Sequence, residues 1–414
     1  MYDFLKGRLV LIRLVLLASV LTLIGVGILS IYSVGNPAES ADSPGTDGLD
    51  DFWGKQINFF VIGAVIFIAV NLINYRRVGS ASYWIYAGTL VLLIVLLVDR
   101  FVDLSFVPVI NGSRRWLRFQ IMGKELPAIQ PSEFCKLAYI LALAWYLRYR
   151  SNYRRFRALI GPFVLTLVPM ILILLEPDLG TVLLMMPILF VMLFVAGAKL
   201  KHLLLIVLLA VLVSPLLWRQ MNQYQRIRIS SVLLQSNWLQ DKAQKHPRLG
   251  QILVGKNFSR EQWMKDWGYH LIRSKYAVAS GGTKGYGFRR GPFVKYNFLF
   301  ARHNDFIFAV IAHQWGFLGC IGLLGLYTII IACGLEIAGH NTDPFGRLVA
   351  VGIVTMFAVE VIVNVSMTLG LMPITGLTLP FVSYGGSSLL VSMASVGFLN
   401  NIGRRRPFSV ARKV

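Results

Sequence analysis

The chain has 414 residues, 56% of them hydrophobic and 14% charged, with a mean hydropathy of +0.63. Its apolar residues form blocks of roughly 16 to 30 positions that are apolar on every side, which argues against both a water-soluble domain and a membrane β-barrel. The net charge is +22. Because the basic residues lie between the blocks and not in a soluble domain, membrane topology explains this charge better than nucleic-acid binding.

The apolar blocks predict membrane-spanning helices from the amino terminus onward. The spans cover residues 9–34, 57–73, 83–98, 133–147, 159–175, 181–198, 203–218, 306–335, 348–371 and 380–402. The first block is too long for the apolar region of a cleavable signal peptide, so we expect it to be retained. The predicted fold is an all-α polytopic membrane protein with about ten transmembrane helices, forming a single domain over residues 1–414.

Basic residues in short loops indicate the cytoplasmic side. Segment 148–157 contains five arginines and the tail 403–414 contains five basic residues, whereas segment 35–55 has five acids and one lysine. With ten spans, both termini are expected on the cytoplasmic side of the membrane. Segments 35–55, 99–132 and 219–305 are then extracytoplasmic loops.

The loop 219–305 is long and basic. It holds sixteen Lys or Arg against three acids before Asp305, and such an excess can attract an anionic ligand or lipid headgroups. The mixed polar and amphipathic stretch from Ser230 to Trp267 predicts short helices lying on the membrane interface. Within the same loop, the glycine-rich segment 279–295 could present backbone N–H groups and lysines to a phosphate, or serve as a flexible linker.

Several ionisable side chains fall at or within the predicted spans, where charge is costly and often functional. Asp305 immediately precedes a span and could act as a general base on a hydroxyl, or cap the helix. Glu133 and Lys136 share one helix face and can pair with each other or with a third partner. Glu360 lies mid-span and must be neutral, paired or facing a cavity.

Two further segments suggest a broken backbone beside such a cavity. In "EPDLGT", residues 176–181, Pro177 ends one helix, Asp178 can cap the next, and Glu176 remains at the boundary. In "GLMPITGLTLPFVSYGGSS", residues 370–388, proline and glycine interrupt the chain between the last two spans. Non-helical backbone at membrane depth must be buried in protein or line a wet cavity.

These segments together resemble the SEDS family (shape, elongation, division and sporulation), the RodA/FtsW group of bacterial wall polymerases. The resemblance rests on "NGSRRWL", "QPSEFCK", "EPDLGT", "ASGGTKGYG", "HNDFIFAVIA" and "GLMPITGLTLPFVSYGGSS", in family order. It implies a peptidoglycan glycosyltransferase that polymerises lipid II on the outer face of the cytoplasmic membrane, beside a class B penicillin-binding protein. The short amino terminus and "DFIFAVIA" are more similar to the elongation branch, RodA.

The resemblance also implies roles for residues. It assigns the catalytic aspartate to Asp305. The implied substrate-binding positions are Arg115, Trp116, Glu133, Lys136, Glu176, Asp178, Lys284, His303, Ser383, Gly385, Gly386 and Ser387. Membrane lipids, lipid II and the penicillin-binding protein are the expected partners. A divalent cation, Mg²⁺ or Mn²⁺, could share the stabilisation of the leaving diphosphate, although neither the three cysteines nor any other residues show metal-ligand spacing.

The chain departs from the family pattern around Asp305. Relatives have a Pro-Glu pair where this chain has Phe300 and Ala301, a threonine in place of Asn304, and an acidic pair in place of His313 and Gln314. The loss of three carboxylates should depress the pKa of Asp305 relative to those relatives. This loss keeps a noncatalytic scaffold for wall synthases open as an alternative to the polymerase. A lipid II flippase also stays open, because a ten-helix protein with intramembrane Glu360, broken segments and a cationic loop could move lipid II across the membrane.

Overall fold

The computed structural model describes most of the chain. It covers residues 9–36, 51–109, 114–118, 120–121, 124–125, 127–149, 156–221, 223–265, 267–296, 298–299 and 301–405. Parts of the sequence-based expectations lie outside these residues. They are the acidic loop residues 37–50, the start of "NGSRRWL" at 111–113, the arginine-rich residues 150–155, Phe300 and the basic tail 406–414.

Within the described residues, ten long helices coincide with the ten predicted spans, and the all-α prediction is confirmed. They are α1 (Val10–Gly35), α2 (Phe52–Leu72), α3 (Tyr75–Val102), α4 (Pro131–Leu147), α5 (Ile160–Leu175), α6 (Leu179–Val195), α7 (Leu200–Gln220), α14 (Ile307–Gly339), α15 (Pro344–Thr368) and α16 (Gly386–Arg404). Six segments, at α1, α2, α3, α5, α14 and α15, are individually long and apolar enough to cross a membrane.

Some predicted boundaries were wrong. Residues 75–82, expected to precede a span, belong to α3, because Asn74 caps that helix by accepting a hydrogen bond from the Arg76 N–H at 3.1 Å. The last helix starts at Gly386 instead of residue 380. Residues 374–385 are non-helical, and side chains of neighbouring elements donate to several of their carbonyls, including those of Ile374 and Leu377.

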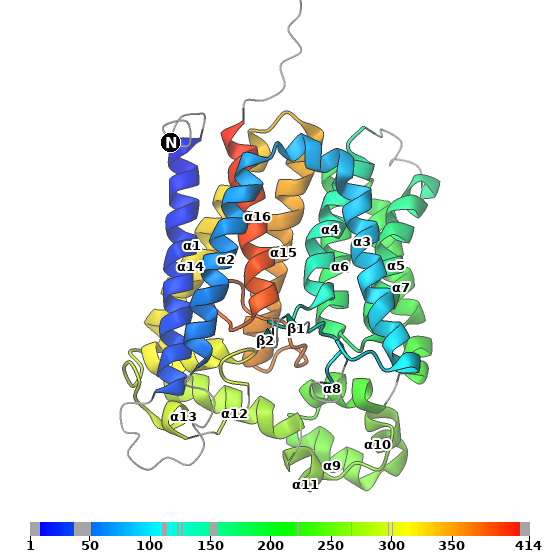
Figure 1. Ribbon diagram of the computed structural model, residues 1–414. Helices are drawn as coiled ribbons and strands as arrows, with labels where there is room; N and C mark the ends of the chain where they lie inside the picture. Colours follow the sequence, from blue (N-terminus) through cyan, green and yellow to red (C-terminus); the bar gives the residue numbers. More distant parts are fainter. Residues whose placement is uncertain are drawn as a thin grey trace, which may run out of the picture.

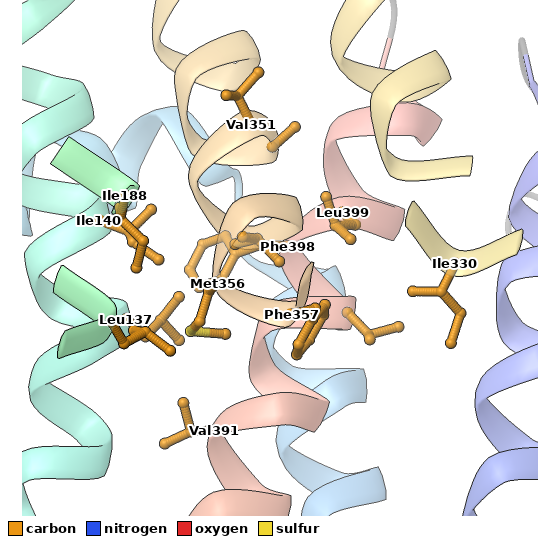
Figure 2. Close-up of a cluster of buried hydrophobic side chains, with 14 of the residues drawn as sticks. Leu137, Ile140, Ile188, Ile330, Val351, Met356, Phe357, Val391, Phe398 and Leu399 are labelled. Atoms are coloured by element: carbon orange, nitrogen blue, oxygen red, sulfur yellow. The ribbon is translucent and has the colours of Figure 1, made fainter. Parts of the chain in front are cut away.

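The long helices pack around α15, which is the most deeply buried of the six segments. Figure 2 shows where side chains of several helices meet there. The labelled residues are Leu137 and Ile140 of α4, Ile188 of α6, Ile330 of α14, Val351, Met356 and Phe357 of α15, and Val391, Phe398 and Leu399 of α16. This core holds the ends of α4, α6, α14 and α16 in fixed relation, and the functional residues lie at those ends.

The basic loop folds into short helices at one end of the bundle, as its sequence predicts (Figure 1). They are α8 (Gln223–Leu233), α9 (Asn237–Lys245), α10 (Pro247–Val254), α11 (Arg260–Lys265), α12 (Trp267–Ser280) and α13 (Pro292–Lys295). A small separate core of Leu234, Ala243, Val254, Phe258 and Trp263 holds α8 to α11 together. A two-residue antiparallel ladder, β1 (Gln120–Ile121) with β2 (Lys124–Glu125), lies near the same end, and a 3-10 turn (Phe156–Leu159) precedes α5.

A break in α14 joins the glycine-rich loop to the bundle. Gly316 has φ 62° and ψ −159°, so the helix is interrupted there. The freed N–H groups of Phe317 and Leu318 donate to Gly282 and Thr283 at 2.9 and 3.2 Å. In return, the N–H groups of Tyr286 and Gly287 donate to carbonyls of α14 at 3.1 and 2.9 Å. The loop carbonyls thus accept the backbone N–H groups that the break leaves without helical partners. The N–H groups of Tyr286 and Gly287 are used by α14 and are not free to bind a phosphate.

Candidate functional site

Asp305 lies in the turn just before α14, and surrounding elements hold its backbone. The amide of Asn364 on α15 donates to the carbonyls of Asp305 and Leu377 at 3.1 and 2.7 Å. The Ser383 hydroxyl donates to the Asn304 carbonyl at 2.8 Å. The helix-cap alternative does not hold, because Phe306 is the N-cap residue and no side chain makes a capping hydrogen bond there. The carboxylate is therefore available for another role.

Burial and charge act in opposite directions on this carboxylate. Burial raises the pKa of Asp305 to about 6. The positive charges of Arg228 and Arg115 lower the pKa, and the negative charge of Asp178 raises it. The net shift is upward from the ordinary value, so the carboxyl group titrates close to neutral pH, where a general base works best. The sequence predicts a lower pKa for Asp305 than for the corresponding aspartate of relatives. That comparison involves other proteins, and it stays a prediction.

The two arginines are fixed by backbone carbonyls. Arg115 donates to the carbonyls of Glu176 and Pro177 at 2.8 and 2.6 Å, and so ties the segment before β1 to the turn between α5 and α6. Arg228 on α8 donates through Nε to the Ile374 carbonyl at 2.8 Å, and a second guanidinium nitrogen reaches the same oxygen. Each guanidinium is therefore fixed while it holds a non-helical segment, and from this place its charge acts on Asp305.

Asp178 organises the start of two helices. Its side chain caps α6 through the Thr181 N–H at 3.3 Å, as the sequence predicts, and also accepts from the Thr181 hydroxyl at 3.0 Å. The Ser132 hydroxyl donates to it at 2.9 Å and the Gln130 amide at 3.3 Å. The Gln130 N–H in turn donates to the Ser387 hydroxyl at 2.9 Å, which links α4 to α16. This network brings three of the predicted motifs together.

His303 has an aromatic role. Its ring stacks on Phe52 with centroids 4.6 Å apart and meets the Tyr384 ring edge-on at 5.8 Å. Burial, aided by the charge of Arg302, lowers the pKa of His303 to about 4, so the ring is neutral at physiological pH. The Tyr384 N–H donates to the His303 carbonyl at 2.9 Å. The ring thereby packs the turn that carries Asp305 against α2 and against the segment that leads into α16.

Lys136 forms the centre of a buried charge group. Its ammonium lies 2.8 Å from Glu133 and 2.6 Å from Glu360, and all three side chains are almost fully buried. The predicted pairing of Glu133 and Lys136 is confirmed, and Glu360 is the third partner. Because both carboxylates hold the ammonium, Lys136 links α4 to α15, and its charge is already engaged within the protein.

The remaining predicted positions are only partly brought to Asp305. Glu176 is buried at the same turn that Arg115 holds, and Trp116 is half-buried beside Arg115. Gly385 and Gly386 allow close packing: the Gly385 N–H donates to Gln56, and a Cβ on Gly386 would come within 2.6 Å of the Phe59 ring. Lys284 is exposed on the loop bound at Gly316. No contact among the described residues joins Lys284 to the Asp305 group.

The described residues around Asp305 form no dense cluster of metal ligands. In the described part of the chain, no group of three or more His, Cys, Asp or Glu side chains could hold a metal ion. The Asp178 Oδ2 accepts from three side-chain donors and its Oδ1 accepts from the Thr181 N–H, and the charges of two arginines act on Asp305. The three cysteines are buried and unpaired with one another. Within the protein, Asp178 is thus paired with neutral hydrogen-bond donors, and Asp305 is influenced by the charges of two arginines.

Sequence reasoning missed several residues that build this site. Arg228 is one of sixteen cations in the basic loop, and nothing in its spacing distinguishes it from the others. Gln56 and Asn364 are single amides at the edge of one apolar block and within another, and their importance comes from partners more than ten residues away. A buried amide inside an apolar run is the one signal that could have identified Asn364.

Comparisons with known proteins agree with this arrangement. The RodA of Treponema pallidum (strain Nichols), named a peptidoglycan glycosyltransferase, is 35% identical over 94% of this chain and 97% of its own. A solved peptidoglycan synthase complex, described as coordinating polymerization and crosslinking, matches with TM-score 0.69 and 29% identity over 94% of this chain and 96% of its own. The rod shape determining protein RodA of Thermus thermophilus matches with TM-score 0.61 and 28% identity over 94% and 95%. Residues 13–407 match the family described as cell cycle proteins of the FtsW, RodA and SpoVE type. The chain belongs to this family of membrane proteins.

Proposed function

We propose that the chain is a peptidoglycan glycosyltransferase that polymerises lipid II at the outer face of the cytoplasmic membrane during cell elongation. One observation carries this proposal. A half-buried carboxylate, Asp305, lies at the end of a membrane bundle, where the charges of two guanidinium groups fixed by backbone carbonyls act on it. Lipid II combines a prenyl tail, a diphosphate and a sugar. Its site therefore needs an apolar region for the tail, cations for the diphosphate and a base beside the sugar. The relatives' names support the same assignment.

In the proposed reaction, the Asp305 carboxylate accepts the proton of a sugar hydroxyl on one substrate. The hydroxyl oxygen forms a bond to the anomeric carbon of the second substrate, whose bond to the diphosphate oxygen breaks. Undecaprenyl diphosphate leaves with that electron pair. Arg115 and Arg228 then stabilise the growing negative charge, because they are already oriented by carbonyls and need little reorganisation. Lys136, held by two glutamates, supports the fold around the site instead.

Orientation and partner follow from the same proposal. The α8 to α13 segment and the loops 35–55 and 99–132 lie outside the cytoplasm, and both termini lie inside. The abundance of arginine in segment 148–157 supports this orientation. The similar complex that coordinates polymerization and crosslinking supports a crosslinking partner, which we take to be a class B penicillin-binding protein. Membrane lipids complete the surroundings.

The decisive experiment is polymerisation of labelled lipid II by the purified protein, with its transpeptidase partner, in detergent. Asp305→Asn should lower the rate by about 100-fold or more, because general-base catalysis contributes 10²- to 10⁴-fold. Asp241→Asn, at an exposed acid of the same loop, is the matched control and should retain activity.

Detergent removes the barrier that a flippase would need, so glycan chains formed by the native protein argue against the flippase. A scaffold would make none. Absence of polymer with the native protein would reject the proposal, whereas equal polymer from Asp305→Asn would reject only the assigned base.

A further inference from the structure

Asn364 joins the peptide of Asp305 to the non-helical segment that follows α15. It is fully buried near the end of α15. Its side-chain nitrogen donates to the Asp305 carbonyl at 3.1 Å and to the Leu377 carbonyl at 2.7 Å, so both of its side-chain N–H bonds are used. Its side-chain oxygen has no hydrogen-bond partner among the described residues. The amide therefore serves this position through its two donors.

The segment 374–377 lies against the Asp305 carboxylate. A Cβ on Gly376 would lie 3.7 Å from Asp305 Oδ2, and apart from the chain neighbours of the glycine no other atom of the described residues comes within 4 Å of that point. Gly376 has a φ of 77°, which glycine adopts without strain. The side of Gly376 that faces Oδ2 is therefore open, and a hydroxyl group has room to approach the base there.

Three contacts fix this segment. Arg228 on α8 donates to its first carbonyl at 2.8 Å. The start of α6 packs on the next carbonyl, because a Cβ on Gly180 would come within 3.0 Å of it. Asn364 makes the third contact, and of the three it is the one that also has a hydrogen bond to the peptide of Asp305. It thereby sets the distance between the base and segment 374–377.

The turn that carries Asp305 is held at three successive carbonyls. The carbonyls of the two preceding residues accept hydrogen bonds from the Tyr384 N–H at 2.9 Å and from the Ser383 hydroxyl at 2.8 Å. Asn364 donates to the third carbonyl from a different element, α15. Loss of the Asn364 amide should therefore release Asp305 while the two preceding carbonyls, and the turn with them, stay in place.

We propose that Asn364 is a positioning residue for the base of the reaction proposed above, and the inference rests on that function. Its amide fixes the Asp305 carboxylate beside the open side of Gly376, where the attacking hydroxyl lies. A general base must be within hydrogen-bond reach of the proton that it accepts, and a displacement of about 1 Å can lower the rate by about 100-fold. Asn364 thus acts on the chemical step through Asp305, without touching the substrate.

The test is a double-mutant cycle on lipid II polymerisation by the full chain, purified in detergent with its transpeptidase partner. Asn364→Leu keeps the branching of the side chain and removes both donors. It should lower kcat by about 10- to 100-fold and change KM by less than about threefold. In the Asp305→Asn background it should change the residual rate by less than about twofold, because its effect passes through the base. If that residual rate is too low to measure, kcat and KM of the single variant decide.

Thr355→Val is the matched control in the same helix. It removes a buried hydroxyl that donates to the Val351 carbonyl at 2.8 Å, and it should leave kcat unchanged. If Asn364→Leu fails to fold, Asn364→Ser takes its place in the cycle, because serine is smaller and retains one donor. Asn364→Ser should likewise lower kcat only where Asp305 is present.

The outcomes separate this inference from the proposed function. An equal fractional loss in both backgrounds, or a higher KM with kcat unchanged, would show a merely structural or binding role and overturn the inference. Native protein that polymerises lipid II, with its kcat retained in Asn364→Leu, rejects the inference and leaves the proposed function intact. Absence of polymer from the native protein rejects the proposed function, and the inference with it.

Discussion

At the scale of single residues, the site depends on a balance around one carboxylate. Burial raises the pKa of Asp305, while two fixed guanidinium groups oppose this effect. Because burial prevails, the group is protonated below about pH 6 and ionised above it. A general base must be ionised to accept a proton, so the direction of the pH dependence follows.

The rate of polymerisation should therefore increase with pH, with an inflection near pH 6, measured as kcat/KM for lipid II. Arg228→Gln removes a positive charge that lowers the pKa of Asp305, so the inflection should move to higher pH. Arg260→Gln, at an exposed arginine paired at 3.8 Å with Asp241, should leave the inflection in place. An unshifted inflection in Arg228→Gln would mean that this arginine does not act on the base.

A second residue-scale prediction concerns the buried lysine. Lys136→Met leaves Glu133 and Glu360 without their shared cation, and breaking a buried ion pair costs about 3–5 kcal/mol. Thermal unfolding in detergent should show a clear loss of stability. Lys55→Met disrupts the exposed pair with Asp51 and should cost less than about 1 kcal/mol. Similar unfolding temperatures for the two variants would contradict the structural role given to Lys136.

At the scale of elements, the break in α14 is the feature on which the loop depends. Gly316→Ala should destabilise the protein by about 1–3 kcal/mol, because its positive φ strains any other residue. The added Cβ would also come within 2.5 Å of the Gly285 nitrogen. Gly325→Ala is the control in the same helix, where a Cβ meets nothing within 4 Å and helix propensity favours alanine. Thermal unfolding measures the stability of both variants. Equal stability would contradict the dependence of the glycine-rich loop on the break in α14.

The helix α14 also shows which structural features can be predicted from the sequence. Local patterns predict the ten helices, the cap at Asp178 and the pair of Glu133 with Lys136, because each depends on neighbours within one helix or turn. The break at Gly316 is not visible in hydropathy, since a glycine inside an apolar run changes the average little. Its partners lie about thirty residues earlier. Periodicity carries no information on such long-range pairing.

The candidate site divides in the same way. The resemblance identifies Asp305, and residue spacing shows that Glu133 and Lys136 can pair. The role of Arg228 depends on how α8 packs against the bundle, and only three-dimensional contacts specify this. The glycine-rich loop is the clearest difference: its composition suits a phosphate site, but two of its N–H groups are used by α14.

At the scale of the whole molecule, the cationic helices lie at one end of the bundle, and the start of α1 and the end of α16 lie at the other. Figure 1 shows the start of α1 and the end of α16 at one end, and α8 to α13 at the other. The excess of Lys and Arg on both sides means that charge alone does not fix the orientation of the long loop. The short loops must do so, and their arginines indicate the side that stays in the cytoplasm.

This orientation can be read from cysteine labelling, because the native Cys135, Cys320 and Cys333 are all buried and should react slowly. Lys265→Cys places a thiol on exposed α11, and Arg77→Cys places one on α3 near the opposite end of the bundle. A membrane-impermeant maleimide applied to intact spheroplasts should label the first variant at once and the second only after permeabilisation. The reverse pattern would put Asp305 and its arginines on the cytoplasmic side, where a polymer exported to the wall could not be made.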